Sequence, residues 1–156
     1  MRYLAFLFSF ILLLPAVSYA ADDLDQLLQG YSVVTKTLGG ATATLVSDIQ
    51  ASHNADEAAT RIETYAIVYH AVAETFKNVM PAFLKAKTAG TITALERQSM
   101  VESSQRMSEL GRVLTSESDV FDTALKPYQN DPRVAAALTT FMNEGRAMQA
   151  IAQQYK

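Results

Sequence analysis

The sequence predicts an all-α protein folded as an antiparallel four-helix bundle, and three observations lead to this fold class. Apolar residues recur in alternating steps of three and four along one segment, which places their side chains on one stripe of a helix. Three shorter segments show similar spacing and predict further helices. No segment alternates apolar and polar residues for long enough to predict a strand. The longest stripe comprises Ile62, Tyr65, Tyr69, Val72, Phe76, Val79 and Phe83.

The first twenty residues predict a cleaved secretory signal peptide. Arg2 supplies a positive charge, residues 4–17 form a strongly apolar run, and residues 18–20 (Ser-Tyr-Ala) offer small residues for cleavage. Because the run is short, we expect no stable membrane anchor after cleavage, with a retained N-terminal anchor as the alternative. The mature chain, residues 21–156, is then expected to form a single helical-bundle domain in the periplasm.

The net charge and the lack of cysteine limit the kinds of molecule that this protein is expected to bind and the compartment in which it is expected to work. The formal net charge is −3, and it becomes −4 without Arg2, the one charged residue of the first twenty. This mild acidity argues against a nucleic-acid partner and against a basic helix lying on a membrane. The chain has no cysteine and no Asn-x-Ser/Thr site, which favours a bacterial periplasmic protein that relies on its core rather than on disulfides.

The first predicted helix begins near the start of the mature chain and carries its own apolar face. Gly39 and Gly40 lie inside this helix and weaken it. The apolar pattern continues across the pair, so the pattern predicts one helix that either bends there or approaches a neighbouring helix closely. The residues that recur every seven positions are Leu24, Tyr31, Leu38 and Leu45.

The second predicted helix carries the longest stripe. Asn54, with Glu57 three residues later, predicts its N-terminal cap. Pro81 interrupts the helix, but Phe83 keeps the phase of the stripe, which indicates a kink rather than an end. Gly90 is the expected C-terminal cap.

The third predicted helix opens with a capping box formed by Thr93 and Glu96. Two interpretations of its second half stay open: one continuous helix, or a break near Ser116 that makes a fifth helix. The broken form is preferred, with Ser116 as the cap, because it places Glu117 in a first turn where a carboxylate is stabilised.

The last predicted helix has the strongest start signal in the chain, with Asp131 as N-cap and Pro132 at the first helical position. Gly145 is expected at a position of close contact with another helix. The apolar face consists of Val134, Leu138, Phe141, Met148, Ile151 and Tyr155.

Enzyme chemistry finds little support in the sequence. His53 and His70 are the two histidines, and they lie too far apart to share a metal on one helix face. There is no cysteine nucleophile, no Gly-x-Ser-x-Gly elbow and no P-loop. We therefore expect no enzymatic activity, no catalytic residues, no metal site and no cofactor.

One surface feature predicts a partner site. Ile67 lies opposite the apolar stripe of the second helix, with His70 and Ala71 close by on the same helix. Leu84 is also outside the stripe. Such residues mark either a docking surface or a helix covered on several sides. The sequence thus predicts a non-enzymatic periplasmic protein that binds another macromolecule, as an adaptor, a chaperone-like factor, or an immunity or inhibitor protein. A protein partner is expected, and a homodimer is left open.

The alternative function is a carrier that holds haem or a small apolar ligand inside the bundle. The stretches at residues 21–28 and 150–156 are similar in character to the ends of exported bundle cytochromes. That class ligates haem with a methionine in the first helix and a histidine in the last. Neither residue type occurs in the corresponding predicted helix here, so the resemblance does not extend to the haem ligands.

Overall fold

The structure, a computed structural model, describes residues 24–155. The predicted signal peptide and its cleavage site lie outside the described residues. Helices dominate the described part of the chain, and no strand occurs in it. The all-α prediction is therefore confirmed. The elements are α2 (Leu24–Gln50), α3 (Ala55–Ala89), α4 (Ala94–Ser116), α5 (Ser118–Leu125), the 3-10 turn η1 (Lys126–Tyr128) and α6 (Pro132–Gln153).

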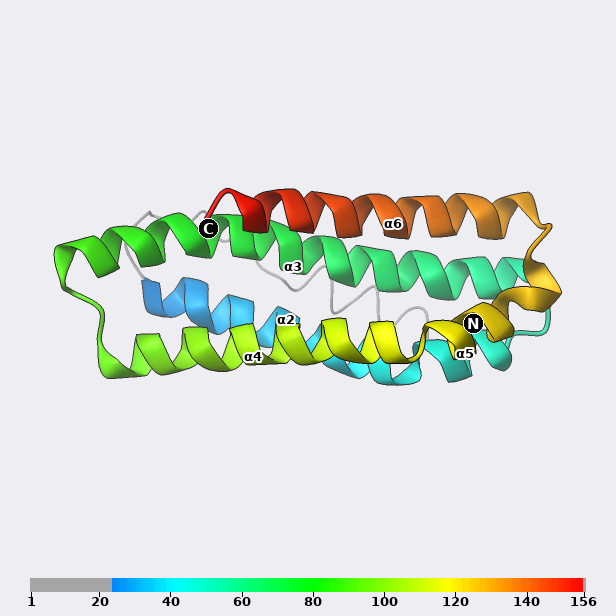
Figure 1. The fold of residues 1–156 in the computed structure, drawn as a ribbon, viewed down its shortest axis with the longest axis horizontal. Helices are drawn as coiled ribbons and strands as arrows, with labels where there is room; N and C mark the ends of the chain where they lie inside the picture. Colours follow the sequence, from blue (N-terminus) through cyan, green and yellow to red (C-terminus); the bar gives the residue numbers. More distant parts are fainter. Residues whose placement is uncertain (1–23, 156) are drawn as a thin grey trace.

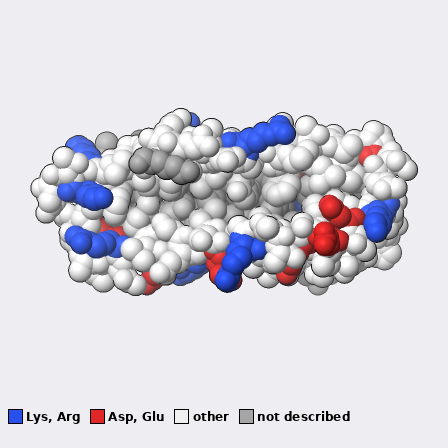
Figure 2. All heavy atoms as spheres, viewed as in Figure 1, with Lys and Arg blue, Asp and Glu red and all other residues white. Residues whose placement is uncertain are grey.

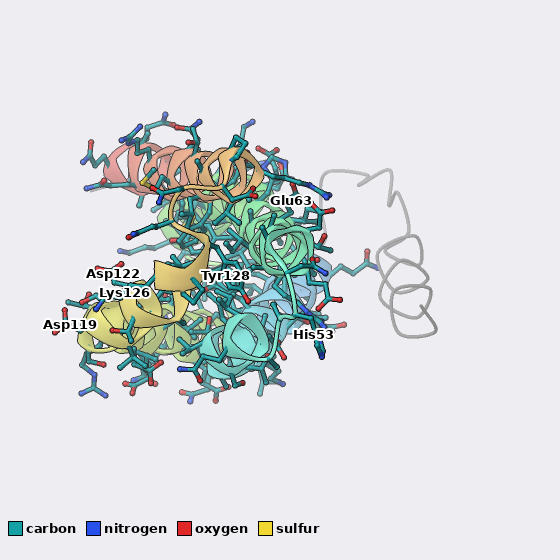
Figure 3. All side chains as sticks on the ribbon, turned by 90° about the vertical axis from the view of Figure 1, so that its right-hand side faces the viewer. His53, Glu63, Asp119, Asp122, Lys126 and Tyr128 are labelled. Atoms are coloured by element: carbon teal, nitrogen blue, oxygen red, sulfur yellow. The ribbon has the colours of Figure 1, made fainter. Side chains whose placement is uncertain are left out.

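The four long helices form an antiparallel bundle that is open along one side. Successive long helices run in opposite directions (Figure 1). Helix α6 packs on α3, α3 packs on α2, and α2 packs on both α4 and α5. Within residues 24–155, α4 and α6 are not packed on each other. Figure 3 shows the result from one end, with α6 above, α4 and α5 at the lower left, and α3 and α2 between them on the right.

The core is centred on the α2–α3 pair, because both helices are buried by neighbours on more than one side. On α3, the stripe divides into two groups. Ile62, Tyr65, Val72 and Val79 are buried, whereas Tyr69, Phe76 and Phe83 are only half-buried. The ring of Phe76 lies 5.7 Å from that of Tyr31 on α2 and 6.2 Å from that of Tyr155 on α6. The half-buried row therefore faces the side that α4 and α6 leave open.

The predicted helix ends are largely confirmed by capping hydrogen bonds. The Asn54 side chain accepts a bond from the Glu57 amide at 2.9 Å. Thr93 and Glu96 form a complete capping box. Gly90 ends α3 with a φ of 70°, a left-handed conformation that glycine adopts without strain. Asp131 caps α6 through the amides of the next residues, Arg133 and Val134.

The break in the third predicted helix is confirmed, but its cap is not Ser116. Ser116 is the last residue of α4, and its hydroxyl donates back to the Val113 carbonyl oxygen at 3.0 Å. Glu117 is the single junction residue, and its side chain makes no capping bond. Its φ and ψ of −99° and 7° are close to helical. An N-cap side chain acts from an extended residue, which this abrupt junction does not supply.

The glycines of the helices do not mark close helix contacts. Helix α2 runs unbroken through Gly39 and Gly40. A Cβ atom added at Gly39, Gly40 or Gly145 would meet no non-local atom within 4 Å. The close-approach interpretation of the pair and the contact expected at Gly145 are therefore wrong, because these positions face space rather than a neighbouring backbone. Helix α3 likewise continues through Pro81, as the phase of Phe83 predicted.

Candidate functional site

The predicted partner residue Ile67 lies in a hollow between α3 and α6, which we call the α3–α6 hollow. Its side chain is 49 % exposed, which is high for a large apolar residue on a central helix. The α3 residues of the hollow are spaced by three and four and so share one helix face. The volume is about 500 Å³. The lining residues are Glu63, Ala66, Ile67 and His70 from α3, and Thr140 and Glu144 from α6.

A histidine–carboxylate pair bridges the two helices at this hollow. The Nδ1 atom of His70 lies 2.8 Å from Oε2 of Glu144. A second cross-link between the same helices joins Arg133 Nη1 to Asp56 Oδ1 at 2.8 Å, and this contact raises the pKa of the Arg133 guanidinium. Glu63 makes no ion pair with any described residue. The hollow therefore combines an apolar floor with acidic side chains at its edge.

The structure brings together two of the three residues predicted for the partner site. Ile67 and His70 both line the α3–α6 hollow, whereas Ala71 is half-buried and does not line it. Glu63 and Ala66 were not predicted, although helical spacing could have identified them, because they lie one turn before Ile67 and His70. Thr140 and Glu144 were missed, because helical periodicity does not state which face of α6 meets which face of α3.

A buried polar cluster between α2 and α4 was also missed. The guanidinium of Arg106 donates to the hydroxyls of Ser32 and Ser103, each at 3.0 Å, and to Thr35 at 3.4 Å. Thr35 and Ser103 are fully buried. Burial raises the pKa of the neighbouring Tyr31 to about 12, although the positive charge of Arg106 acts in the opposite direction. Since the hydroxyls come from both helices, the cluster fastens α4 to α2.

Between residues 24 and 155, no three His, Cys, Asp or Glu side chains lie in a group that could hold a metal ion. No helix in that range combines the length and the apolar content needed to cross a membrane.

Comparison with known proteins does not add a family to these observations. The chain matches no protein-family model, no curated protein and no solved structure. Its function must therefore be argued from the residues of its own surface.

Proposed function

We propose that this protein binds a protein partner through the α3–α6 hollow. The observation that carries the proposal is the half-exposed side chain of Ile67 within a concave surface between two packed helices. An isolated exposed apolar residue is ordinary, but one in a hollow offers a pocket for an apolar side chain of a partner. The predicted signal peptide supports a meeting of the two proteins in the periplasm.

The edge of the hollow specifies the chemistry of the partner. Glu63 and Glu144 add negative charge on either side of Ile67. Glu144 already shares its carboxylate with His70. Glu63 forms no direct ion pair with a described residue, although its charge contributes to the raised pKa of Arg133. The complementary surface is an apolar side chain next to a lysine or arginine, since opposite charges steer association and fix its orientation.

The Ile67→Asp variant tests the proposal. It places a charge within the apolar contact, and desolvating that charge without a partner should weaken the complex by about 2–4 kcal/mol. Folding should survive because the side chain is half exposed in the free protein. Immobilised wild type and variant are exposed to periplasmic and cytosolic extracts, retained proteins are identified by mass spectrometry, and affinity is then measured with the purified partner.

Leu84→Asp is the matched control, because Leu84 is 37 % exposed on the same helix and lies outside the hollow. A periplasmic protein retained by wild type and by the Leu84 variant, and lost from the Ile67 variant, supports the proposal. Equal retention by all three proteins contradicts it. A large fall in melting temperature for Ile67→Asp contradicts it as well, since the residue would then be buried in a homodimer. Release of haem or a small apolar molecule on denaturation favours the carrier alternative.

A further inference from the structure

The open side of the bundle contains a second pocket, which we call the open-side pocket. It lies where the junction of α4 and α5 faces α6, with α2 forming its floor. Figure 2 shows the hollowed surface between α6 above and α4 with α5 below. The volume is about 140 Å³. The lining residues are Thr42, Leu45, Val46, Leu114, Glu117, Ser118, Phe121, Asp122 and Phe141.

The size and the walls of this pocket suit one aromatic ring. An apolar protein cavity of about 150 Å³ is large enough to hold benzene. Leu45 and Val46 on α2, Leu114 on α4 and the rings of Phe121 and Phe141 supply apolar walls. Two hydroxyls line the pocket, those of Thr42 and Ser118. The Thr42 hydroxyl is already hydrogen-bonded to Tyr65 at 2.8 Å and to the backbone of its own helix, whereas Ser118 is an exposed residue at the start of α5. The buried part of the pocket therefore offers mainly apolar contact surface to a ligand.

The two charged residues that line this pocket are both acidic. Glu117 and Asp122 are lining residues, and both are exposed to solvent. Neither makes an ion pair with any residue between 24 and 155. Lys126, one turn beyond Asp122, is not among the lining residues. Figure 2 shows acidic atoms gathered over α5 on the lower rim of the hollowed surface.

We infer that the open-side pocket binds a small organic cation whose apolar body is about one ring in size. The ring would lie between the side chains of Phe121 and Phe141, and the ammonium group would face the carboxylates of Glu117 and Asp122. An ammonium group near aromatic faces gains a further electrostatic attraction. This site is independent of the proposed protein-binding function, since Figure 3 places Glu63 and Asp122 on opposite sides of the bundle.

Benzylamine and benzyl alcohol are the probes, because they share one ring and differ in charge at neutral pH. Isotope-labelled protein, residues 21–156, is titrated with each compound at millimolar concentrations and followed by backbone amide NMR. Benzylamine should shift the amides of residues 114–122 and of Phe141, and should bind at least about threefold more tightly than benzyl alcohol, as expected for an exposed charge contact. The amides near Ile67 should stay unchanged.

A double variant, Glu117→Gln with Asp122→Asn, separates the charge contact from the apolar contact. It should weaken benzylamine by about threefold to tenfold and leave benzyl alcohol unchanged. Asp119→Asn is the matched control, since Asp119 is an exposed carboxylate on the same helix and does not line the pocket. All three substituted side chains are exposed, so the melting temperatures should agree.

Several results would overturn the inference. One is the absence of shifts at residues 114–122 with either compound. Another is equal affinity for the amine and the alcohol, which would show that the carboxylates do not recognise a cation. A third is the same loss of affinity in Asp119→Asn as in the double variant, which would indicate general surface charge rather than this pocket. Loss of partner capture in the Ile67→Asp experiment would leave these outcomes unaffected.

Discussion

At the scale of single residues, Tyr31 is a buried titratable group beside a polar contact between α2 and α4. Tyr31 is 1 % exposed, next to the cluster that Arg106 forms with Ser32, Thr35 and Ser103. The Tyr31 hydroxyl makes no hydrogen bond with another described residue. Its phenol is thus buried for packing against Phe76, and its ionisation is opposed by desolvation.

Tyr31 should make the free energy of unfolding fall at high pH. Its pKa is about 12 in the folded protein and 10.0 when unperturbed. Below pH 10 the phenol is protonated in both states, so full stability is present. Above pH 10 the phenol ionises more readily in the unfolded chain than in the folded protein. Between pH 10 and about 12, this difference lowers the free energy of unfolding by about 2–3 kcal/mol. Urea unfolding of Tyr31→Phe should show a shallower decline between these pH values. An identical decline in wild type and variant would exclude Tyr31 as its source.

Tyr65 and Tyr69 should also contribute to the loss of stability at high pH. Burial raises the pKa of both groups, while the hydrogen bond between Thr42 and Tyr65 opposes the shift at Tyr65. Wild-type stability should therefore still decline in Tyr31→Phe, only less steeply. At neutral pH the variant should unfold with nearly the free energy of wild type, because the lost hydroxyl makes no hydrogen bond with any other residue between 24 and 155.

The burial of a residue could be predicted where it depends on one helix alone. It could not be predicted where it depends on how two helices pack against each other. The phase of the α3 stripe placed Ile67 outside the core, and the side chain is indeed half exposed. The same phase placed Phe76 fully inside, but it is half-buried, because α4 and α6 do not close over it. Ser103 is a polar residue of α4, yet it is fully buried, because Arg106 donates a hydrogen bond to its hydroxyl.

At the scale of elements, the helices end where local chemistry dictates, and this is why their boundaries could be predicted. Asn54, Thr93 and Asp131 each accept a hydrogen bond from an orphan amide of the first helical turn. Gly90 turns the chain out of α3 in a left-handed conformation. The α4–α5 junction was harder to predict in detail, since Glu117 interrupts the helix without a capping side chain.

The glycine pair in α2 should be replaceable by alanine with a gain in stability. Gly39 and Gly40 are helical, neither has a positive φ, and both leave room for a Cβ atom. Gly39→Ala and Gly40→Ala should each stabilise the protein by about 1 kcal/mol, measured by thermal or urea unfolding. Gly90→Ala is the contrasting control and should destabilise by about 1–2 kcal/mol, because alanine is strained at φ 70°. A loss of stability from either α2 substitution would revive the close-contact interpretation.

At the scale of the whole molecule, the order in which helices pack explains where both proposed sites lie. The helices pack in the order α6–α3–α2–α4, so the two end helices, α6 and α4, do not pack against each other. The open-side pocket lies between these two helices. Within residues 24–155, the chain passes from one side of this opening to the other at the end of the bundle, where η1 leads from α5 to α6 (Figure 1). There the Tyr128 hydroxyl donates to the Ser52 carbonyl oxygen at 2.6 Å and ties the crossing to the α2–α3 turn.

This openness could not be predicted from the sequence. Helical periodicity identifies an apolar face on each element, and four such faces suggest a closed square. Whether the bundle is closed depends on whether the apolar faces of α4 and α6 are wide enough to pack against each other. Helix α4 buries only Met100, Ser103 and Leu110, which is enough to cover α2 but not to pack against α6. The pocket at the α4–α5 junction follows from that shortfall, and no single segment encodes it.

The same asymmetry should appear in the order in which the helices open. Helices α2 and α3 hold most of the core, and α6 is fastened to α3 by apolar residues and by the ring of Phe141, 5.3 Å from that of Tyr65. Helix α4 rests on α2 with a partly polar contact. Native-state amide hydrogen exchange should therefore show α4 opening at least about 1 kcal/mol below α2 and α3.

Leu110→Ala sharpens this prediction, because Leu110 is one of the few apolar residues that α4 buries. The variant should accelerate exchange in α4 and α5 and leave α6 nearly unchanged, since α6 packs on the opposite end of the row. Uniform acceleration in all four long helices would mean instead that the bundle unfolds as one unit. In that case α4 would open with the same free energy as α6, and the open-side pocket would not lie beside a locally less stable helix.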